Sequence, residues 1–145
     1  MACVFCQIVA GALPCSEVLV DDAFMAFMDI YPWRPGHVLV IPRHHATRVS
    51  ELDEPTRAGL FLRAARIADA IRASALPCDD LHFAVNDGRA ANQTVPHVHL
   101  HLLPRRRGDL GRLLLSLLQR PLVPVLRPAP RDRLDRQAAA IRAHL

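Results

Sequence analysis

The sequence predicts an α+β fold in which a five-stranded, mainly antiparallel sheet packs with one long helix and a short N-terminal helix. Three observations support this fold class. The first strand-like segments follow one another with no helix between them, so their connections are short and neighbouring strands run antiparallel. One long segment has apolar residues at helical spacing, and two further strand-like segments follow it. The 145 residues are the length of a single domain.

The first part of the chain predicts the short helix and three strands. Residues 3–9 carry apolar side chains at helical spacing, and Gly11 follows where a helix-stopping residue is expected. Short apolar runs bounded by turn-forming residues predict strands at 17–20, 24–28 and 37–41. The first two runs flank the pair Asp21-Asp22 and are typical of a hairpin, whereas Pro42 ends the third.

The middle of the chain predicts the long helix and the last two strands. Apolar residues recur at helical spacing from Glu54 to Ala75, with arginines between them, and Pro77 ends the run. The segments 81–86 and 97–103 are expected to be the fourth and fifth strands, separated by a loop.

These elements lie in residues 1–107, and residues 108–145 form a basic extension that we expect to belong to the same single domain. Residues 1–104 contain eight arginines and eleven acidic residues, whereas residues 105–145 contain ten arginines and three acidic residues. No zinc finger, aromatic RNA motif or basic heptad pattern accompanies this charge, so general nucleic-acid binding is not expected. Two stretches of the extension have a helical composition and flank a proline-rich piece: 110–118 and 131–145.

The composition also bears on the cellular compartment. No segment approaches the ~20 apolar residues that cross a bilayer, so the protein is expected to be soluble and not to involve a membrane. The first residues lack the basic start and apolar middle of a secretory signal, which makes the cytoplasm the expected compartment. The spacing of the four cysteines does not suggest a disulfide-stapled scaffold.

Three histidines alternate in the predicted fifth strand. Because strand side chains alternate between faces, His97, His99 and His101 share one face at intervals of about 7 Å, while the apolar residues between them share the other. Such a row serves a metal ion, proton transfer or a nitrogen nucleophile. No carboxylate or HExxH motif lies nearby, and three residues in line on one strand do not easily surround a tetrahedral ion, which argues against a metal bound by the whole row.

The central histidine is the candidate nucleophile. A nucleophilic histidine needs a neutral ring whose Nδ1 proton is held by a backbone acceptor, so that the Nε2 lone pair points outward. The two flanking imidazoles disfavour a positive charge on the ring between them. Both conditions select His99.

A second cluster is predicted at the N-terminus. Cys3 and Cys6 are one helical turn apart, which brings both sulfur atoms within reach of a single ion. The alternative is a redox pair, but thioredoxin-type CxxC motifs follow a strand and begin a long helix, and this pair does neither.

Several segments resemble the histidine triad (HIT) family of nucleotide-binding and nucleotide-hydrolysing proteins. The triad segment Asn92-Gln-Thr-Val-Pro-His-Val-His-Leu-His-Leu-Leu-Pro104 carries the family signature. The likeness extends upstream, in the family's order, through Cys3-Val-Phe-Cys6, Ala26-Phe-Met-Asp-Ile30 and Pro35-Gly-His-Val-Leu-Val-Ile-Pro42. It covers roughly residues 1–107 and implies a HIT-like catalytic domain there.

The resemblance implies an enzyme. In that family the middle histidine attacks the α-phosphorus of a nucleotide, and water hydrolyses the resulting nucleotidyl-histidine to a nucleoside monophosphate. His99 is therefore expected to act on a purine nucleotide substrate, either a nucleoside phosphoramidate or a dinucleoside polyphosphate, without an organic cofactor. His101 is expected to contact the phosphate or to assist proton transfer.

The resemblance also assigns substrate contacts. Asp29 matches the residue that holds the ribose hydroxyls, which suits a carboxylate acceptor. Residues that match those around the base are Phe5, Ile8 and Ile30. Polar residues that match those around the phosphates are His37, Asn86, Gln93 and Thr94.

Two further expectations follow from the resemblance. Bacterial members with a CxxC motif often carry a structural zinc ion, and the matching ligands here are Cys3, Cys6, His45 and His97. His97 would then be partly withdrawn from the chemistry. Family members usually form homodimers across their long helices and edge strands, and we expect the same of this chain.

Some alternatives remain at this point. Asn92 stands where the family usually has glycine, which asparagine replaces most readily in a left-handed conformation. Residues 105–107 are three arginines that either add charge near the phosphates or form a solvated turn. Two other functions are a nucleotide-binding adaptor with incidental turnover, against which the intact His99 argues, and a zinc-dependent module that binds nucleic acid through the basic extension.

Overall fold

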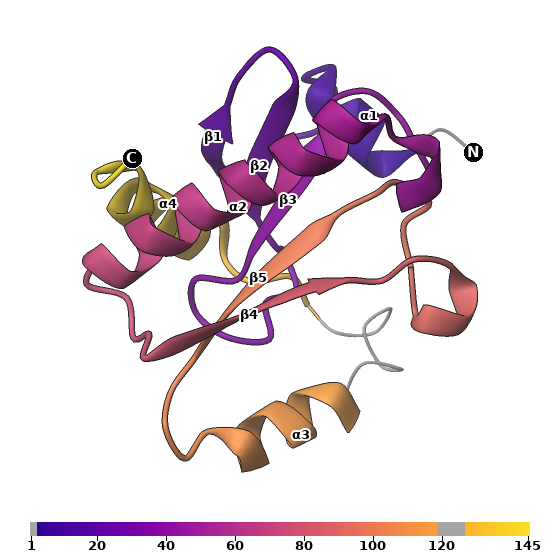
Figure 1. Cartoon of the computed structure of the whole chain (residues 1–145). Helices are drawn as coiled ribbons and strands as arrows, with labels where there is room; N and C mark the ends of the chain where they lie inside the picture. The colour runs from indigo at the N-terminus through magenta and orange to yellow at the C-terminus, as the bar shows by residue number, and fades with distance from the viewer. Residues whose placement is uncertain (1–2, 119–126) are drawn as a thin grey trace.

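The computed structural model describes residues 3–118 and 127–145 (Figure 1). The elements follow in the order α1 (Val4–Val9), β1 (Glu17–Val20), β2 (Phe24–Met28), β3 (Val38–Pro42), η1 (Val49–Glu51), α2 (Glu54–Ala73), β4 (Asp80–Val85), η2 (Arg89–Ala91), β5 (Leu100–Arg105), α3 (Leu110–Leu118) and α4 (Arg131–Arg142). The strands form one sheet in the order β1-β2-β3-β5-β4, and each neighbouring pair is antiparallel. The predicted α+β fold is confirmed.

The long helix α2 has well-defined ends. The side chain of Asp53 caps its first turn by accepting a hydrogen bond from the Thr56 N–H at 2.9 Å. The helix ends at Ala73, a little before the predicted end, because Ser74 leaves the helical conformation with ψ 169°. The Ser74 hydroxyl then donates to the carbonyl of Ile71 at 2.7 Å.

The predicted boundaries of the fifth strand are wrong. The expected span was 97–103, whereas β5 runs over Leu100–Arg105, so His101 is the one histidine of the triad that lies in the strand. The residues before the strand are bonded outside the ladder. Two backbone hydrogen bonds show this: His97 N–H to Val95 O at 2.8 Å, and Val98 N–H to Ala46 O at 2.7 Å.

One face of the sheet is covered by α2 and α4, which lie on the same side in Figure 1. The core between them is built from fully buried side chains of the sheet and both helices: Met28, Val38, Val40, Leu100, Leu102, Ile67, Ile71, Leu134, Ala138 and Ile141. The last three belong to α4, so the C-terminal extension contributes to the core of the domain.

The opposite face of the sheet carries the histidines. Phe5 of α1 packs there against Phe27, Leu39 and Ile41, and its ring also meets the rings of His97 and His99. Val98, Leu100 and Leu102 are buried on the α2 side. The predicted alternation between a histidine face and a core face is therefore confirmed, although only part of it lies within a regular strand.

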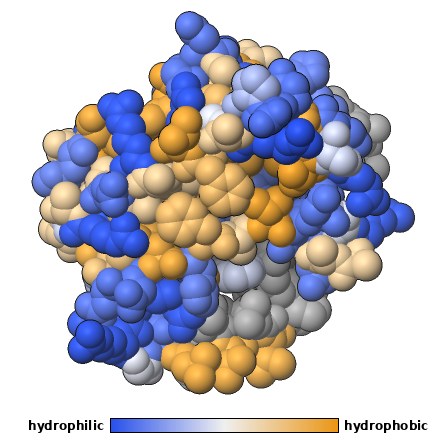
Figure 2. Space-filling view, viewed as in Figure 1, coloured by the Kyte–Doolittle hydropathy of each residue, from blue (hydrophilic) through white to orange (hydrophobic). Residues whose placement is uncertain are grey.

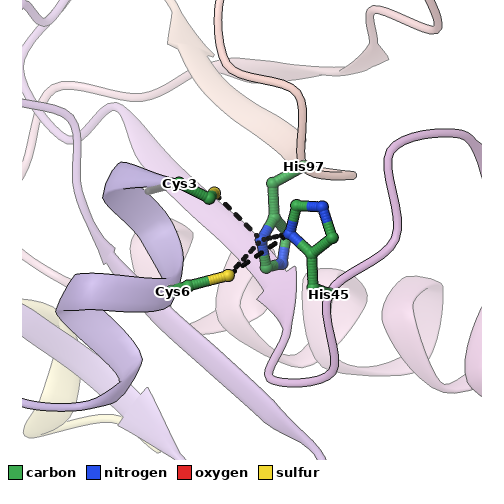
Figure 3. Close-up of side chains that lie close together, drawn as sticks. All are labelled: Cys3, Cys6, His45 and His97. Carbon is green, nitrogen blue, oxygen red and sulfur yellow. Dashed lines mark hydrogen bonds between the residues drawn. The ribbon is translucent and has the colours of Figure 1, made fainter. Parts of the chain in front are cut away.

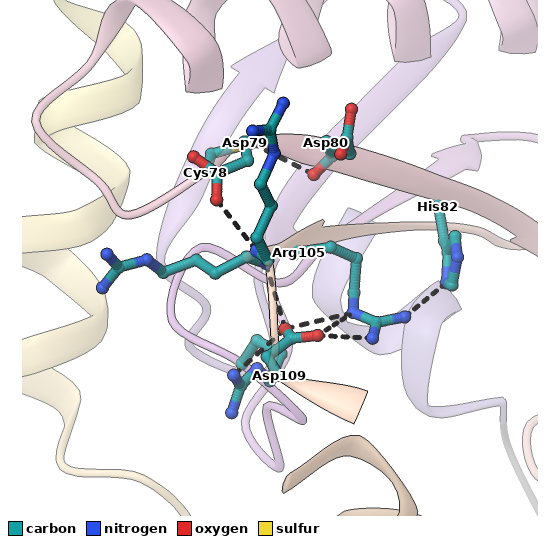
Figure 4. Close-up of polar contacts among 9 residues, drawn as sticks. Cys78, Asp79, Asp80, His82, Arg105 and Asp109 are labelled. Atoms are coloured by element: carbon teal, nitrogen blue, oxygen red, sulfur yellow. Dashed lines mark hydrogen bonds and ion pairs between the residues drawn. The ribbon is translucent and has the colours of Figure 1, made fainter. Parts of the chain in front are cut away.

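Asp109 fastens the segment before α3 to the rest of the domain (Figure 4). Its carboxylate accepts from Arg105 Nε at 2.9 Å and from Arg34 Nη2 at 3.1 Å. The hydrogen bonds from Arg105 are the largest cause that holds the pKa of Asp109 well below its usual range. Arg105 is thus the ion-pair partner of Asp109. None of residues 105–107 lines the cavity that is described below as the candidate active site.

Some apolar side chains lie on the surface. Figure 2 shows apolar colouring along α3 and over α2. The exposed residues concerned are Phe61 and Leu62 of α2 and Leu110, Leu114, Leu115 and Leu118 of α3. Within the described ranges, no helix combines the length and the apolar character that crossing a membrane requires.

Candidate active site

A cavity of about 1120 Å³ opens on the histidine face of the sheet. Most of the predicted substrate-binding residues line it: Phe5, Ile8, Asp29, Ile30, Asn86, Thr94, His99 and His101. His37, His97 and Gln93 do not line it, and each has another place in the structure. Most of the residues that the sequence predicted therefore line the cavity, although other residues make up much of its wall.

One ring nitrogen of His99 is held by the backbone. Its Nδ1 lies 2.7 Å from the carbonyl oxygen of His97, and the residue is 3% exposed. A carbonyl only accepts, so Nδ1 of His99 carries a proton, and in the neutral ring the lone pair is then on Nε2. The predicted contact between Nδ1 and a backbone acceptor is confirmed.

His101 is supported from behind by His37. Nε2 of His37 lies 3.0 Å from Nδ1 of His101, and both residues are buried. The amide N–H of Trp33 lies 3.3 Å from Nδ1 of His37, and in the tautomer that accepts this bond the His37 proton is on Nε2. His37 can then donate to His101, whose own proton lies on Nε2. In this pair of tautomers, His101 is a hydrogen-bond donor at the cavity.

Asp29 lies at the end of β2, beside this pair. One carboxylate oxygen accepts from the Tyr31 N–H at 2.8 Å, and the other lies 3.4 Å from Nδ1 of His37. The half-buried carboxylate lines the cavity. It keeps acceptor capacity for a pair of hydroxyl groups, because a carboxylate accepts several hydrogen bonds at once.

The loop before the triad is shaped by Asn92 and Gln93. Asn92 has φ 62° and ψ 31°, the left-handed conformation that its position was expected to need. Gln93 accepts from the Gly88 N–H at 2.8 Å and donates to the carbonyl of Thr47 at 2.8 Å. Both ends of its amide are bonded to backbone, so Gln93 braces the loop whereas its neighbour Thr94 faces the cavity.

The second predicted cluster is also assembled (Figure 3). Cys3, Cys6, His45 and His97 each offer one ligand atom, and the four atoms lie within 4.8 Å of one another. Nδ1 of His97 lies 3.6 Å from Sγ of Cys3, 3.7 Å from Sγ of Cys6 and 3.3 Å from Nδ1 of His45, and Sγ of Cys6 lies 3.2 Å from that same Nδ1 of His45.

These distances fit a tetrahedral zinc ion. Zinc binds sulfur at about 2.3 Å and histidine nitrogen at about 2.0–2.1 Å, which puts tetrahedral ligands roughly 3.3–3.8 Å apart. The Nε2 of His97 donates to the carbonyl of Pro42 at 2.8 Å, which leaves the Nδ1 lone pair for a metal. Burial is the largest cause that lowers the pKa of His97, and it favours the neutral ring that binds metals. The neighbouring His44 is exposed and outside the cluster.

Several residues of the cavity wall were not predicted. Trp33 lines it and stacks on the His101 ring, with the centroids 6.0 Å apart and the planes at 15°. Arg127 and Arg133 reach the cavity from the C-terminal extension, whose Ala129 N–H donates to the carbonyl of Ile30 at 2.8 Å. Tertiary packing brings the two arginines to the cavity, so the local sequence could not predict them. For Trp33, the available signal in the sequence was a tryptophan in the turn after Asp29.

Cys15 also lines the cavity. Burial raises the pKa of its thiol to about 11, so it is protonated at neutral pH and is not a competing nucleophile.

Comparison with known proteins agrees with this site. The HIT domain model matches residues 10–108. A HIT-like protein of Mycobacterium tuberculosis is 46% identical over 109 residues, which are 75% of each chain. The adenosine 5'-monophosphoramidase hnt1 of Schizosaccharomyces pombe is 35% identical over 111 residues, which are 77% of this chain and 80% of the relative.

The structural comparison extends over nearly the whole chain. A zinc-bound histidine triad family protein from Mycobacterium smegmatis superposes with a TM-score of 0.81 at 38% identity. The match covers 99% of this chain and 93% of that one, so it includes the C-terminal extension that lies beyond the HIT domain model. From its sequence, its fold and the histidines of its cavity, the chain belongs to the HIT family.

Proposed function

We propose that the protein is a nucleotide hydrolase and nucleotidyl transferase in which His99 attacks the α-phosphorus of its substrate. The observation that carries this proposal is the 2.7 Å contact between Nδ1 of His99 and the carbonyl of His97. It holds a neutral ring in one orientation and leaves Nε2 as the nucleophilic atom. Nε2 belongs to a ring that lines the cavity.

The reaction proceeds in two displacements at phosphorus. In the first, Nε2 forms a bond to the α-phosphorus, and the bond from phosphorus to the leaving nitrogen or oxygen breaks. The leaving atom keeps the electron pair and takes a proton. In the second, a water oxygen attacks the phosphorus and gives up a proton, and the electron pair of the Nε2–P bond returns to His99. The product is a nucleoside monophosphate.

Other groups stabilise the charge that develops on the phosphoryl oxygens. His101 donates from Nε2, because Nδ1 is occupied by His37. Asn86 and Thr94 line the same cavity and offer an amide and a hydroxyl. Fixed donors of this kind stabilise a transition state because they need no reorganisation as charge builds up.

The nucleoside is held at the other part of the cavity. Phe5, Ile8 and Ile30 line it with apolar side chains that suit the two faces of a purine base. Asp29 accepts from the ribose hydroxyls through the capacity that the Tyr31 N–H leaves free. The relative from Schizosaccharomyces pombe supports adenosine 5'-phosphoramidate as a test substrate. A dinucleoside polyphosphate is the second substrate class to compare.

The metal cluster is a structural zinc site in this proposal. Cys3 and Cys6 of α1, His45 after β3 and His97 before β5 would hold the ion, which supplies a cross-link between these segments. The zinc-bound relative from Mycobacterium smegmatis supports this choice of metal. The reduced cysteines suit the cytoplasm, where thiols stay reduced. Elemental analysis of the purified protein is expected to give one zinc per chain, with Cys6→Ser losing it and Cys78→Ser keeping it.

A homodimer completes the proposal. Strand β4 is at the edge of the sheet, and its Phe83 is 39% exposed. Phe61 and Leu62 of α2 are 55% and 66% exposed and add apolar surface (Figure 2). An edge strand and exposed apolar side chains favour pairing with a second copy. Light scattering is expected to give twice the chain mass of 16.1 kDa, and a monomer would contradict this part of the proposal.

Single-turnover mixing with adenosine 5'-phosphoramidate tests the chemistry. The expected result is a covalent adenylyl group on His99 that forms and then decays to AMP. The His99→Ala variant is expected to form none, whereas the exposed His144→Ala variant behaves as the unchanged protein. Nucleotide binding without any covalent species or product release would overturn the proposal and leave a nucleotide-binding adaptor.

A further inference from the structure

The side chain and the backbone of His97 face two different sites. Its imidazole belongs to the cluster with Cys3, Cys6 and His45, and its carbonyl oxygen accepts from Nδ1 of His99 at 2.7 Å. The residue is fully buried, and its Nε2 is tied to the carbonyl of Pro42 at 2.8 Å. Because the His97 ring is fixed by these partners, the position of the ring is linked to that of the backbone carbonyl that orients the next histidine of the triad.

Phe5 provides a second connection between the two sites. It lies between Cys3 and Cys6 in the chain, in helix α1. Its ring meets His97 edge-on, with centroids 5.8 Å apart at 71°, and meets His99 edge-on, with centroids 5.3 Å apart at 80°. The position of α1 thus decides whether the wall against the His99 ring is in place.

Helix α1 has little stability of its own. It has six residues, the side chain of its N-cap residue Cys3 does not cap the helix with a hydrogen bond, and no acidic residue lies in its first turn. Isolated helices this short are unstable in water, so tertiary contacts must hold α1 in place. Those contacts are the packing of Phe5 and the two cysteines that meet His45 and His97 (Figure 3).

We infer that the Cys3, Cys6, His45 and His97 cluster, when it holds a metal ion, positions His99 for its attack through the His97 carbonyl and the Phe5 ring. The inference rests on the proposed function of His99. These four residues and Phe5 act through His99 on the rate of nucleotidyl transfer, in addition to cross-linking the N-terminus. Changes to groups that orient a reacting residue or a ligand typically cost roughly 10–100-fold in activity.

Nuclear magnetic resonance of histidine-labelled protein tests the inference without turnover. In the metal-loaded protein, the Nδ1–H of His99 is expected to give a slowly exchanging proton signal that the His99→Ala variant lacks. A chelator is expected to broaden or remove the signal, and added Zn²⁺ is expected to restore it. The Cys78→Ser variant, which alters a cysteine outside the cluster, is the matched control and is expected to respond as the unchanged protein.

Kinetics supply the second readout. The rate of adenylyl transfer at saturating nucleotide is expected to fall roughly tenfold or more on metal removal, separately from any change in half-saturation. A cluster that only stabilises the fold or the nucleoside site would leave this saturating rate within about twofold, and the His99 signal would persist. That pair of results would overturn the inference.

A second variant covers the case in which circular dichroism shows that the metal-free chain unfolds. Phe5→Leu in the metal-loaded protein is expected to lower the saturating rate and shift the His99 signal while zinc stays bound. An unchanged rate and signal would overturn the inference. If no adenylyl-histidine forms in any protein, the proposed function fails, while the His99 signal still shows whether the cluster positions that ring.

Discussion

Nε2 of His37 lies 3.0 Å from Nδ1 of His101, although His37 itself does not line the cavity. The pair is buried, and the Trp33 N–H sets the direction of its hydrogen bond. In the proposed reaction, His37 would be a positioning residue that holds the His101 ring with its donor nitrogen toward the substrate.

Replacing His37 by leucine tests this relationship. The variant fills the buried position with an apolar side chain but removes the hydrogen-bond partner of His101. The saturating rate of nucleotide hydrolysis is expected to fall roughly 10–100-fold, with little change in nucleotide affinity. Stopped-flow measurement of both quantities checks the prediction. His82→Ala, which alters an exposed histidine near Arg105, is the control, and equal rates in the two variants would contradict the prediction.

Asp29 is expected to recognise the ribose. Asp29→Ala should weaken the binding of AMP about tenfold, equivalent to about 1.4 kcal/mol, because the acceptor for the hydroxyl groups is lost. The 2',3'-dideoxy analogue should bind the variant and the unchanged protein alike. Calorimetric titration of both nucleotides into both proteins measures the difference. Asp22→Ala, at an exposed hairpin position, serves as the control, and an equal loss for both nucleotides would point to a general change in the cavity.

Asp109 is expected to make stability depend on acidity. Hydrogen bonds from Arg105 lower its pKa in the folded state, so the unfolded chain binds its proton first as the pH falls. The stabilisation is present above the unfolded pKa of about 3.9 and is lost as the pH falls toward the lower folded pKa. Asp109→Asn should therefore cost about 1.5–3 kcal/mol at pH 7, the range for hydrogen bonds to a charged group.

Urea unfolding of both proteins at pH 7 and at pH 3 measures this dependence. The difference in free energy of unfolding between the unchanged protein and the Asn variant should shrink at pH 3. The unchanged protein loses stability there because its unfolded state takes up the Asp109 proton, whereas the Asn variant has no proton to take up at this position. Asp132→Asn removes an exposed ion pair and is expected to show a much smaller difference. A difference that is constant with pH would exclude the ion pair as its source.

A side chain at position 59 of α2, where the protein has Gly59, is expected to destabilise the fold. A Cβ at this position of α2 would lie 2.7 Å from Cζ of Phe24, a buried ring that also carries the Arg63 guanidinium at 4.6 Å from its centroid. Gly59→Ala should lower the free energy of unfolding by about 1–3 kcal/mol through overpacking. Gly111→Ala in α3 meets no atom within 4 Å and should be neutral or stabilising by up to about 1 kcal/mol. Thermal unfolding of the two variants would contradict the prediction if both gained stability.

The sheet and the histidine row were predictable because local periodicity determines them. Alternation through residues 97–102 assigns one face to the core and one to the histidines, whether or not the ladder is regular, and both faces were found. The start of β5 was not predictable, because Val98 bonds to Ala46, a partner 52 residues away in the chain. Nothing in the sequence near Val98 marks that bond.

In the candidate site, too, local features were predictable and features that depend on distant residues were not. Reasoning from strand geometry found His99 and expected a backbone acceptor for its Nδ1, and the structure identifies that acceptor as the carbonyl of His97, two residues away. The roles of Gln93 and Arg105 depend on partners elsewhere in the fold, Thr47 and Gly88 for the first and Asp109 for the second. A glutamine or arginine side chain can hydrogen-bond to a phosphate or to other groups of the protein. Only the tertiary structure distinguishes the two uses.

The packing of α4 has a consequence for synthesis of the protein. Ser16, next to β1, donates to Asp135 of α4 across 119 residues at 2.6 Å, and Leu134, Ala138 and Ile141 fill the core over the sheet. A chain emerging from the ribosome therefore makes its first strands long before the helix that covers them. Until residues 131–142 have left the exit tunnel, the part of the sheet that α4 covers keeps an open apolar face, and the chain is then exposed to aggregation and to chaperones.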